Sequence, residues 1–210
     1  MIIVFTLTII SLNSCVNPTT YKYGDFLYKN AAQARIKIIK YEGKGGDVVI
    51  PAKILGYENI IDKGAFQNYD TITSIKLPDT VITIDDYAFQ NCTGLKSVTF
   101  VPSGRSDVGP CNIGNYAFQN CTALTNFHFP DFVTSLGDGA FSGCSGLHAA
   151  YFEGDAPSEY QMGKDVFAGT ASDFTIYYNA DKSGWSDGWN GYHAVPLPAT
   201  TTPSTKPNLV

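Results

Sequence analysis

Tyr87-Ala88-Phe89-Gln90-Asn91-Cys92 recurs unchanged as Tyr116-Ala117-Phe118-Gln119-Asn120-Cys121, and related hexapeptides begin at residues 64, 139 and 165. The phenylalanines of successive copies are 23, 29, 23 and 26 residues apart. The shortest spacing gives the length of one unit, and the longer spacings add insertions of six and three residues. Self-similarity at a period of this size is typical of repeat architectures, in which each unit packs on the next.

Apolar residues follow each hexapeptide at fixed offsets. The four triplets are Ile72, Ile75 and Leu77; Leu95, Val98 and Phe100; Leu124, Phe127 and Phe129; and Leu147, Ala150 and Phe152. One unit of this length cannot bury its own apolar side, whereas stacked units share a continuous core. Strands of successive units then pair in parallel, about 4.8 Å apart. The pattern therefore predicts a solenoid, and it requires Phe66, Phe89, Phe118 and Phe141 to lie in one file.

Residues 71–168 resemble the BspA-like, or type-5, leucine-rich-repeat family of bacterial surface proteins, whose unit reads L-x-x-I-x-I-P-x-x-V-x-x-I-G-x-x-A-F-x-x-C. The resemblance implies a leucine-rich-repeat solenoid, with parallel strands in a right-handed coil and short helical or 3₁₀ turns at the Ala-Phe segments. Residues 23–51 and 151–197 are similar to the family's terminal caps, which predicts one capped domain over residues 23–197. Surface display and protein or host binding are further implications.

The two ends of the chain have a different composition. Residues 2–12 are an apolar run that is too short to cross a bilayer, and they predict a signal peptide over residues 1–15. Leu12-Asn13-Ser14-Cys15 resembles a bacterial lipobox, which implies lipidation of Cys15, although no Lys or Arg precedes the run. An ordinary signal peptide or a buried strand are the alternatives. We expect a linker at residues 16–22 and a Pro/Thr-rich tail at residues 198–210.

Composition and cysteine spacing exclude several functions. The net charge of −5, without a basic run, argues against nucleic-acid binding. Cys92, Cys121 and Cys144 share one phase of the repeat, but no Cys-x-x-Cys pair or histidine accompanies them, so we expect no metal site and no cofactor. A column of buried thiols is the favoured interpretation, and a disulfide between Cys92 and Cys121 stays open. Cys111, in an insertion, is expected to be the most exposed thiol.

No catalytic constellation emerges from the repeat register. Asp62 and Asp85 occupy a phase in which other units carry glycine, and we expect a turn with positive φ there rather than an acid–base pair. His128 and His148 are expected to lie about 10 Å apart along the strands, too far to share zinc. We therefore expect that the protein is not an enzyme.

Exposed residues of the units form columns on one face of the predicted sheet. The candidate binding residues of this concave face are Lys76, Lys96, Thr99, Thr125, Asn126, His128, His148 and Tyr151. Their hydroxyl, amide, cationic and aromatic groups suit adaptable contacts with a protein or a glycan on a host or neighbouring cell. The sequence favours a secreted, lipid-anchored adhesion or binding module of the cell surface, which contacts membrane through the anchor alone. The alternative is a structural spacer or envelope lipoprotein without a specific ligand.

Overall fold

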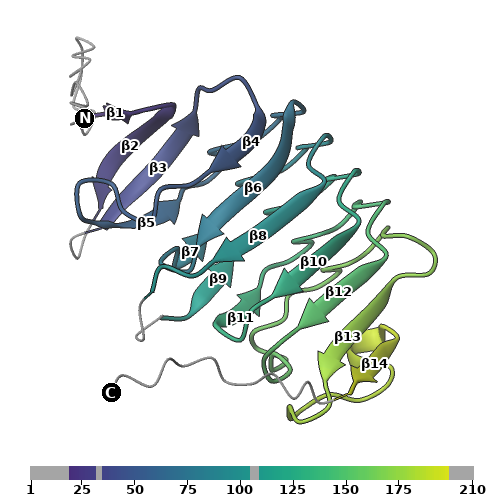
Figure 1. Cartoon of the computed structure of the whole chain (residues 1–210). Coiled ribbons are helices and arrows are strands. Elements are labelled where there is room, and N and C mark those ends of the chain that lie inside the picture. The colour runs from purple at the N-terminus through teal and green to yellow at the C-terminus, as the bar shows by residue number, and fades with distance from the viewer. Residues whose placement is uncertain (1–18, 32–34, 105–108, 199–210) are drawn as a thin grey trace, which may run out of the picture.

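The computed structural model describes residues 19–31, 35–104 and 109–198, and its strands stack as successive turns of a solenoid (Figure 1). The predicted fold is confirmed. The expected signal peptide, the lipidation site at Cys15 and residues 199–210 of the expected tail lie outside the described residues. Within the described residues, no helix has both the length and the apolar character needed to cross a membrane.

Most turns contribute one strand to each of two opposite sides of the solenoid, one formed by a single sheet and the other by two sheets. The seven-stranded sheet has the order β1-β2-β3-β5-β7-β9-β11, with β1 (Tyr21–Tyr23), β2 (Phe26–Ala31), β3 (Arg35–Tyr41), β5 (Glu58–Ile61), β7 (Thr83–Ile84), β9 (Cys111–Ile113) and β11 (Val133–Leu136). The opposite side carries β4 (Gly46–Val49), β6 (Ile72–Pro78) and β8 (Ser97–Val101), followed by β10 (Asn126–Phe129), β12 (Ala149–Phe152), β13 (Thr175–Asn179) and β14 (Ala194–Leu197). Figure 1 shows β6, β8, β10, β12 and β13 side by side in chain order.

The two ends of the solenoid are closed by caps. At the N-terminal end β1, β2 and β3 form an antiparallel meander, and β3 then pairs in parallel with β5. Strand β1 begins at Tyr21, which pairs with Tyr28, so this first strand begins two residues before the expected start of the capped domain. At the C-terminal end, β13 and β14 continue the parallel sheet, and the short 3₁₀ helix η1 (Trp189–Gly191) lies between them in sequence.

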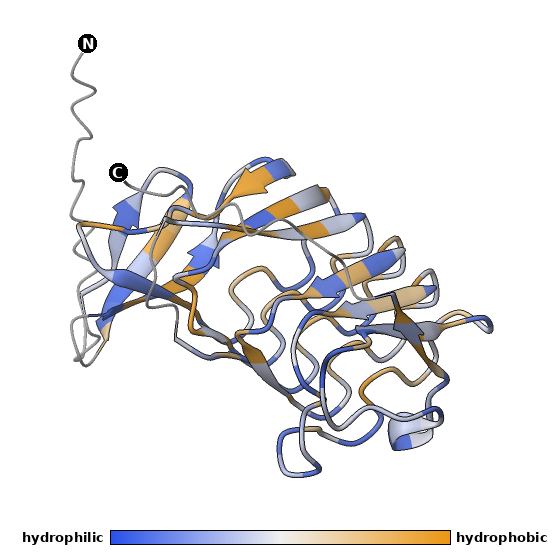
Figure 2. Cartoon of the chain, turned by 60° about the horizontal axis from the view of Figure 1, so that its bottom comes forward, coloured by the Kyte–Doolittle hydropathy of each residue, from blue (hydrophilic) through white to orange (hydrophobic). Residues whose placement is uncertain are grey.

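The repeated phenylalanines form the predicted file in the core. Successive rings of Phe66, Phe89, Phe118 and Phe141 stack with centroids 4.7, 5.0 and 5.1 Å apart. All four side chains are fully buried. Bands of high and low hydropathy alternate along the strands, as Figure 2 shows, because neighbouring residues of a strand point to opposite faces. This file forms part of the hydrophobic core between the two sides of the solenoid.

The Ala-Phe segments are hydrogen-bonded turns rather than the expected helical or 3₁₀ segments. Each segment holds 3₁₀-type bonds, such as that from the amide of Gln90 to the carbonyl of Tyr87. Positive φ angles interrupt every segment twice, for example 58° at Tyr87 and 59° at Asn91. Left-handed residues end a helix, so successive bonds cannot build a continuous one.

The expectation of a positive φ at Asp62, Asp85 and their glycine counterparts is wrong. The positive φ lies two residues later, at Gly64 and Tyr87. Glycine is needed at residue 137 for a different reason, because an added Cβ would lie 2.5 Å from the backbone nitrogen of Asn115 in the preceding turn. This position therefore serves close approach between turns rather than an unusual backbone angle.

The cysteine column is confirmed, whereas the predicted exposure of Cys111 is wrong. Cys92, Cys121 and Cys144 are buried, and their thiols donate to the carbonyls of the phenylalanines one turn earlier at 3.1, 3.3 and 3.1 Å. Cys111 is also fully buried, because it begins β9 and pairs with Val133, in the column where other turns carry valine. None of the four is disulfide-bonded, and burial raises the pKa of Cys92 and of Cys111 to about 12.

Candidate binding face and its cleft

The predicted columns of surface residues exist on the side of the solenoid that carries two sheets, β4-β6-β8 and β10-β12-β13-β14. Lys76 pairs with Thr99, and His128 pairs with Tyr151, across neighbouring strands. Tyr151 is half-buried, and the other seven candidate residues are exposed. Lys96, Thr125 and His148 each lie one residue before a strand rather than on it. The candidate residues therefore share one side of the solenoid.

An aromatic stack runs across the C-terminal half of this face. The ring centroids of His128 and Tyr151 are 4.5 Å apart with planes 13° apart, and those of Tyr151 and Tyr177 are 5.1 Å apart at 16°. The parallel register of β12 and β13, in which Tyr177 pairs with Tyr151, extends the column into the cap. Because stacked rings cover one another's faces, Tyr151 offers mainly its ring edge and hydroxyl to a ligand.

The two histidines of the face have different partners. His128 stacks on Tyr151, whereas His148 Nδ1 lies 2.5 Å from the Oδ1 atom of Asp173. Among the described residues, no group of three or more His, Cys, Asp or Glu side chains is arranged to hold a metal ion.

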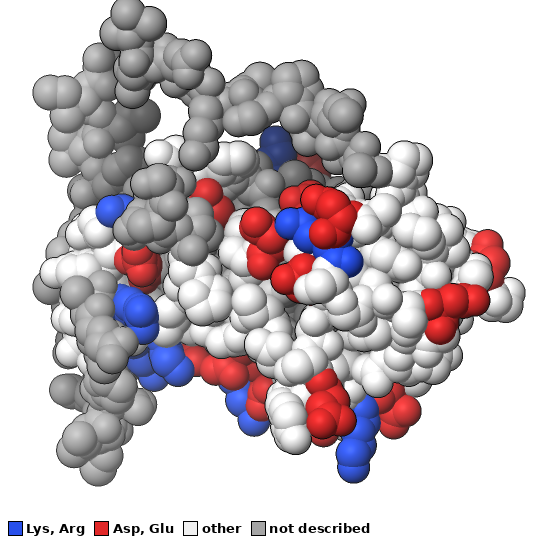
Figure 3. All heavy atoms as spheres, turned by 90° about the horizontal axis from the view of Figure 1, so that it is seen from below, with Lys and Arg blue, Asp and Glu red and all other residues white. Residues whose placement is uncertain are grey.

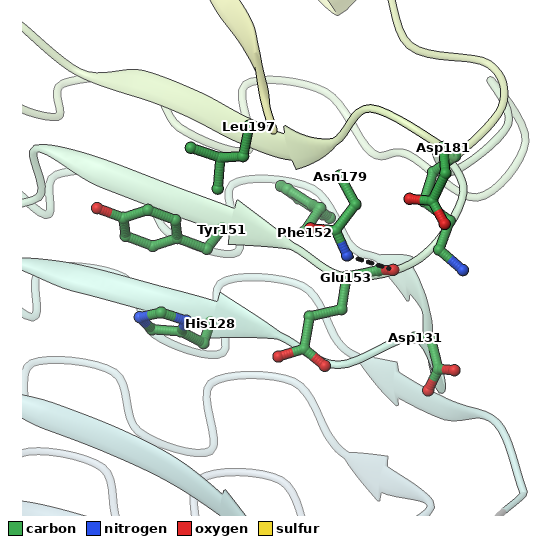
Figure 4. Close-up of a pocket in the computed structure, with 9 residues that line it drawn as sticks. His128, Asp131, Tyr151, Phe152, Glu153, Asn179, Asp181 and Leu197 are labelled. Atoms are coloured by element: carbon green, nitrogen blue, oxygen red, sulfur yellow. Dashed lines mark hydrogen bonds between the residues drawn. The ribbon is translucent and has the colours of Figure 1, made fainter. Parts of the chain in front are cut away.

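A cleft of about 510 Å³ adjoins the aromatic stack, at the ends of β10, β12 and β13 (Figure 4). Its walls are formed by His128, Asp131, Tyr151, Phe152, Glu153, Asn179, Asp181, Lys182 and Leu197. His128 and Tyr151 thus belong both to the stack and to the cleft. In Figure 4 the carboxylate of Glu153 projects between His128 and Asp131.

Contacts between the repeat and the C-terminal cap build the cleft. Asn179 Nδ2 donates to the carbonyl of Glu153 at 3.4 Å, and Trp185 Nε1 donates to the carbonyl of Gly154 at 3.2 Å. The ring of Trp185 also stacks on Tyr178, with centroids 5.1 Å apart. These bonds hold the loop that follows β13 against the loop that follows β12, so the cleft belongs to the folded framework.

Negative charge dominates the cleft. Three carboxylates, those of Asp131, Glu153 and Asp181, face one cation, Lys182, which leaves a formal charge of −2. None of the three carboxylates takes part in the ion pairs found among the described residues. Loss of hydration and the neighbouring Asp131 raise the pKa of Glu153, and His128 partly opposes this shift. Figure 3 shows acidic side chains gathered around a few basic ones on the side of the molecule seen from below.

Sequence reasoning missed both Tyr177 and the cleft. Tyr177 could have been found, because aligning Ile176 with Ala150 continues the alternation of the repeat into β13. The cleft residues Asp131, Glu153 and Asp181 follow strands as loop residues and share no repeat phase. Whether these three residues come together depends on how two loops of different length pack. The repeat period does not specify that packing.

Comparison with known proteins places the fold among bacterial repeat proteins. The family described as BspA type leucine rich repeat region matches residues 59–182 in 6 copies, which is more than half of the 210 residues. None of the curated proteins compared with the chain matches it.

The crystal structures that resemble the chain include three bacterial proteins. A leucine-rich repeat protein from Bacteroides capillosus has 24% identity and a TM-score of 0.54, over 64% of this chain and 98% of that one. A leucine rich cell surface protein from Faecalibacterium prausnitzii has 26% identity and a TM-score of 0.51, over 82% of this chain and 57% of that one. The pneumococcal vaccine antigen PcpA has 15% identity and a TM-score of 0.56, over 79% and 44%. The first and third likenesses concern the fold alone.

Proposed function

This chain belongs to the BspA-type leucine-rich repeat family, and on that premise we propose that it is an adhesion or binding module of the cell surface. Its ligand is a protein or a glycan, and the sheet face with its aromatic stack is the contact surface. The single observation that carries this proposal is the partly exposed stack of His128, Tyr151 and Tyr177 beside a cleft of about 510 Å³. Aromatic groups next to a concave polar site are common at binding surfaces.

Binding accounts for this face better than catalysis does. The cleft beside the stack is lined by the carboxylates of Asp131, Glu153 and Asp181, and all three are exposed residues. Asp62, the other acidic candidate from the sequence, forms an ion pair of 2.8 Å with Lys37 and lies at a turn. We therefore propose a role without chemistry on the ligand.

Display at the surface is the second part of the proposal. It is supported by the apolar run at residues 2–12, which Cys15 follows closely, and by the similarity to a cell surface protein from Faecalibacterium prausnitzii. Growth with a palmitate analogue should label the wild-type protein, and Cys15→Ala should abolish the label. Equal labelling of both proteins would exclude an anchor at this residue.

The binding role is tested with the full chain on immobilised matrix proteins and a glycan array. Wild-type protein should bind at least one probe saturably, and the combined variant Lys96→Ala, His128→Ala and Tyr151→Ala should lose at least tenfold in affinity. The control variant Lys53→Ala with Tyr160→Ser removes a cation and an aromatic ring from exposed loops elsewhere, and it should bind like wild type.

Three results would contradict the proposal. Absence of saturable binding across both arrays would favour the spacer role. Unchanged binding by the triple variant, with its thermal unfolding midpoint preserved, would move the contact away from this face. Loss of binding in the control variant would also move the contact away from this face.

A further inference from the structure

We propose that the cleft at the ends of β10, β12 and β13 receives an arginine side chain of a partner protein. The inference rests on the proposed function, because it names the partner chemistry for the same face. It draws on three features of the described residues, which are the cleft's charge, its apolar walls and the orientation of its aromatic rings.

Charge complementarity identifies a cationic occupant. Three carboxylates with one lysine leave the cleft negative, and the three have no ion-pair partner among the described residues. The lysine ion pairs of the described residues lie elsewhere, near the N-terminal end, where they join Lys22, Lys37 and Lys40 to carboxylates. A cation entering the cleft would therefore gain attraction from carboxylates that are not already neutralised.

The walls favour arginine over a small cation. Leu197 and the edge of Tyr151, both partly exposed, provide apolar surface along which the aliphatic stem of the side chain can lie. The planar guanidinium carries donors on several edges and can bond to two carboxylates at once, whereas an ammonium group is a point charge. A cleft of about 510 Å³ is large enough for the side chain together with part of its backbone.

The aromatic geometry argues against a sugar at the same place. A pyranose ring binds aromatic residues by lying flat on a ring face, but both faces of Tyr151 are covered, by His128 at 4.5 Å and by Tyr177 at 5.1 Å. On Tyr151 only the ring edge and the hydroxyl group remain accessible. These can line the path of a peptide more readily than they can stack on a sugar.

The probe is a short acetylated peptide with two arginines separated by glycine, and its neutral counterpart carries citrulline instead. Calorimetry with the full chain at low ionic strength should show binding of the arginine peptide and at least tenfold weaker binding of the citrulline peptide. The variant Asp131→Asn, Glu153→Gln and Asp181→Asn should also lose at least tenfold. All three residues are exposed, so these near-isosteric changes should leave the fold intact.

A matched charge control separates the cleft from the overall acidity of the chain. Asp25→Asn, Asp70→Asn and Glu159→Gln remove three exposed carboxylates outside the cleft, and this variant should bind the arginine peptide within twofold of wild type. Equal losses in both variants would mean that only net charge attracts the peptide, which overturns the proposal. Equal affinity for the arginine and citrulline peptides would overturn it as well.

The two proposals can fail separately. If the cleft variant keeps its affinity for an array ligand that the face variant loses, the face binds a ligand but the arginine site is wrong. If the cleft variant loses affinity for a glycan while the arginine peptide does not bind, the cleft is a glycan site and the inference is overturned. Loss of arginine-peptide binding in the cleft variant alone supports the inference.

Discussion

The rings of Phe89 and Phe118 lie nearly parallel, 8° apart, with centroids separated by 5.0 Å in the centre of the solenoid. Phe118 also packs edge-on against Phe127, so its ring connects the turn segment to the sheet. Removing it would leave a cavity between two turns. We expect Phe118→Ala to lower the free energy of unfolding by about 3–5 kcal/mol, measured by urea denaturation.

The exposed ring of Tyr160 is the control for this prediction. Its side chain is 91% exposed, and Tyr160→Ser should change the free energy of unfolding by less than about 0.5 kcal/mol. A loss below about 1 kcal/mol in Phe118→Ala would indicate that the stack is not the structural core that its burial implies.

The period alone is enough to predict this stack. Phe66, Phe89, Phe118 and Phe141 occupy one phase, and stacking of equal turns brings equal phases together. The same reasoning gives a wrong prediction for Cys111. Its place in an insertion predicts exposure, whereas its pairing with Val133 of β11 buries it. An insertion changes the number of residues in a unit. Strand pairing still places one residue in the buried column, and that position requires a small apolar side chain.

The buried thiols should resist alkylation in the native protein. Burial raises the pKa of Cys92 and Cys111 to about 12, so the thiolate, which is the reactive species, is scarce at pH 8. In a Cys15→Ala variant only the four buried thiols remain. We expect no labelling by a thiol reagent within minutes without denaturant, and four labels per chain in urea. Rapid labelling of Cys111 in the native state would contradict its burial.

Close approach between turns makes residue 137 intolerant of any side chain. A Cβ on Gly137 would lie 2.5 Å from the backbone nitrogen of Asn115, and neither backbone can move without disturbing the stack. We expect Gly137→Ala to lower the free energy of unfolding by about 2 kcal/mol or more. Gly109 is the matched control, because an added Cβ there meets nothing within 4 Å, and Gly109→Ala should be close to neutral. Similar losses in both variants would contradict the steric explanation.

The raised pKa of Glu153 predicts a pH-dependent gain in stability when its charge is removed. Loss of hydration and Asp131 make the ionised form unfavourable, and His128 offsets part of this effect. For an acid whose pKa is raised on folding, stability is fully present below the unfolded pKa and falls as pH rises through the folded pKa.

Glu153→Gln should therefore be more stable than wild type at pH 7, by less than about 1 kcal/mol because solvent screens this exposed residue. Near pH 3.5, where the wild-type carboxyl is protonated in both states, the difference should largely vanish. Thermal unfolding of the two proteins, compared at the two pH values, measures this difference. A larger difference at the lower pH would contradict the sign of the shift.

The binding site is less predictable than the core, for a physical reason that Tyr151 and Glu153 illustrate. Tyr151 lies on a strand of the repeat, so its phase predicts its place beside His128. Glu153 lies two residues further on, in a loop whose position depends on bonds to Asn179 and on the packing of Trp185. Periodicity determines what repeats, whereas a cleft formed between a repeat and its cap depends on contacts that occur once.

The asparagine ladder offers a way to separate backbone conformation from hydrogen bonding. Asn91 Nδ2 donates to Asn68 Oδ1 at 2.8 Å, and Asn120 Nδ2 donates to Asn91 Oδ1 at 2.9 Å. All three residues have positive φ, and Gly143 takes the same position in the next turn with φ 71°. Both Asn91→Gly and Asn91→Ala remove the two bonds, but only alanine is strained at φ 59°.

We expect Asn91→Gly to lower the free energy of unfolding by about 1–2 kcal/mol, through the lost bonds and the greater freedom of the unfolded chain. Asn91→Ala should cost about 0.5–1 kcal/mol more, because the left-handed strain of alanine exceeds its entropic advantage over glycine. Urea denaturation of the two variants measures this difference directly. If alanine proved the milder substitution, the backbone at this corner would have to relax out of the left-handed region. The glycine at residue 143 would then reflect crowding by Asn120 Oδ1, with which any added Cβ would clash, rather than its φ angle.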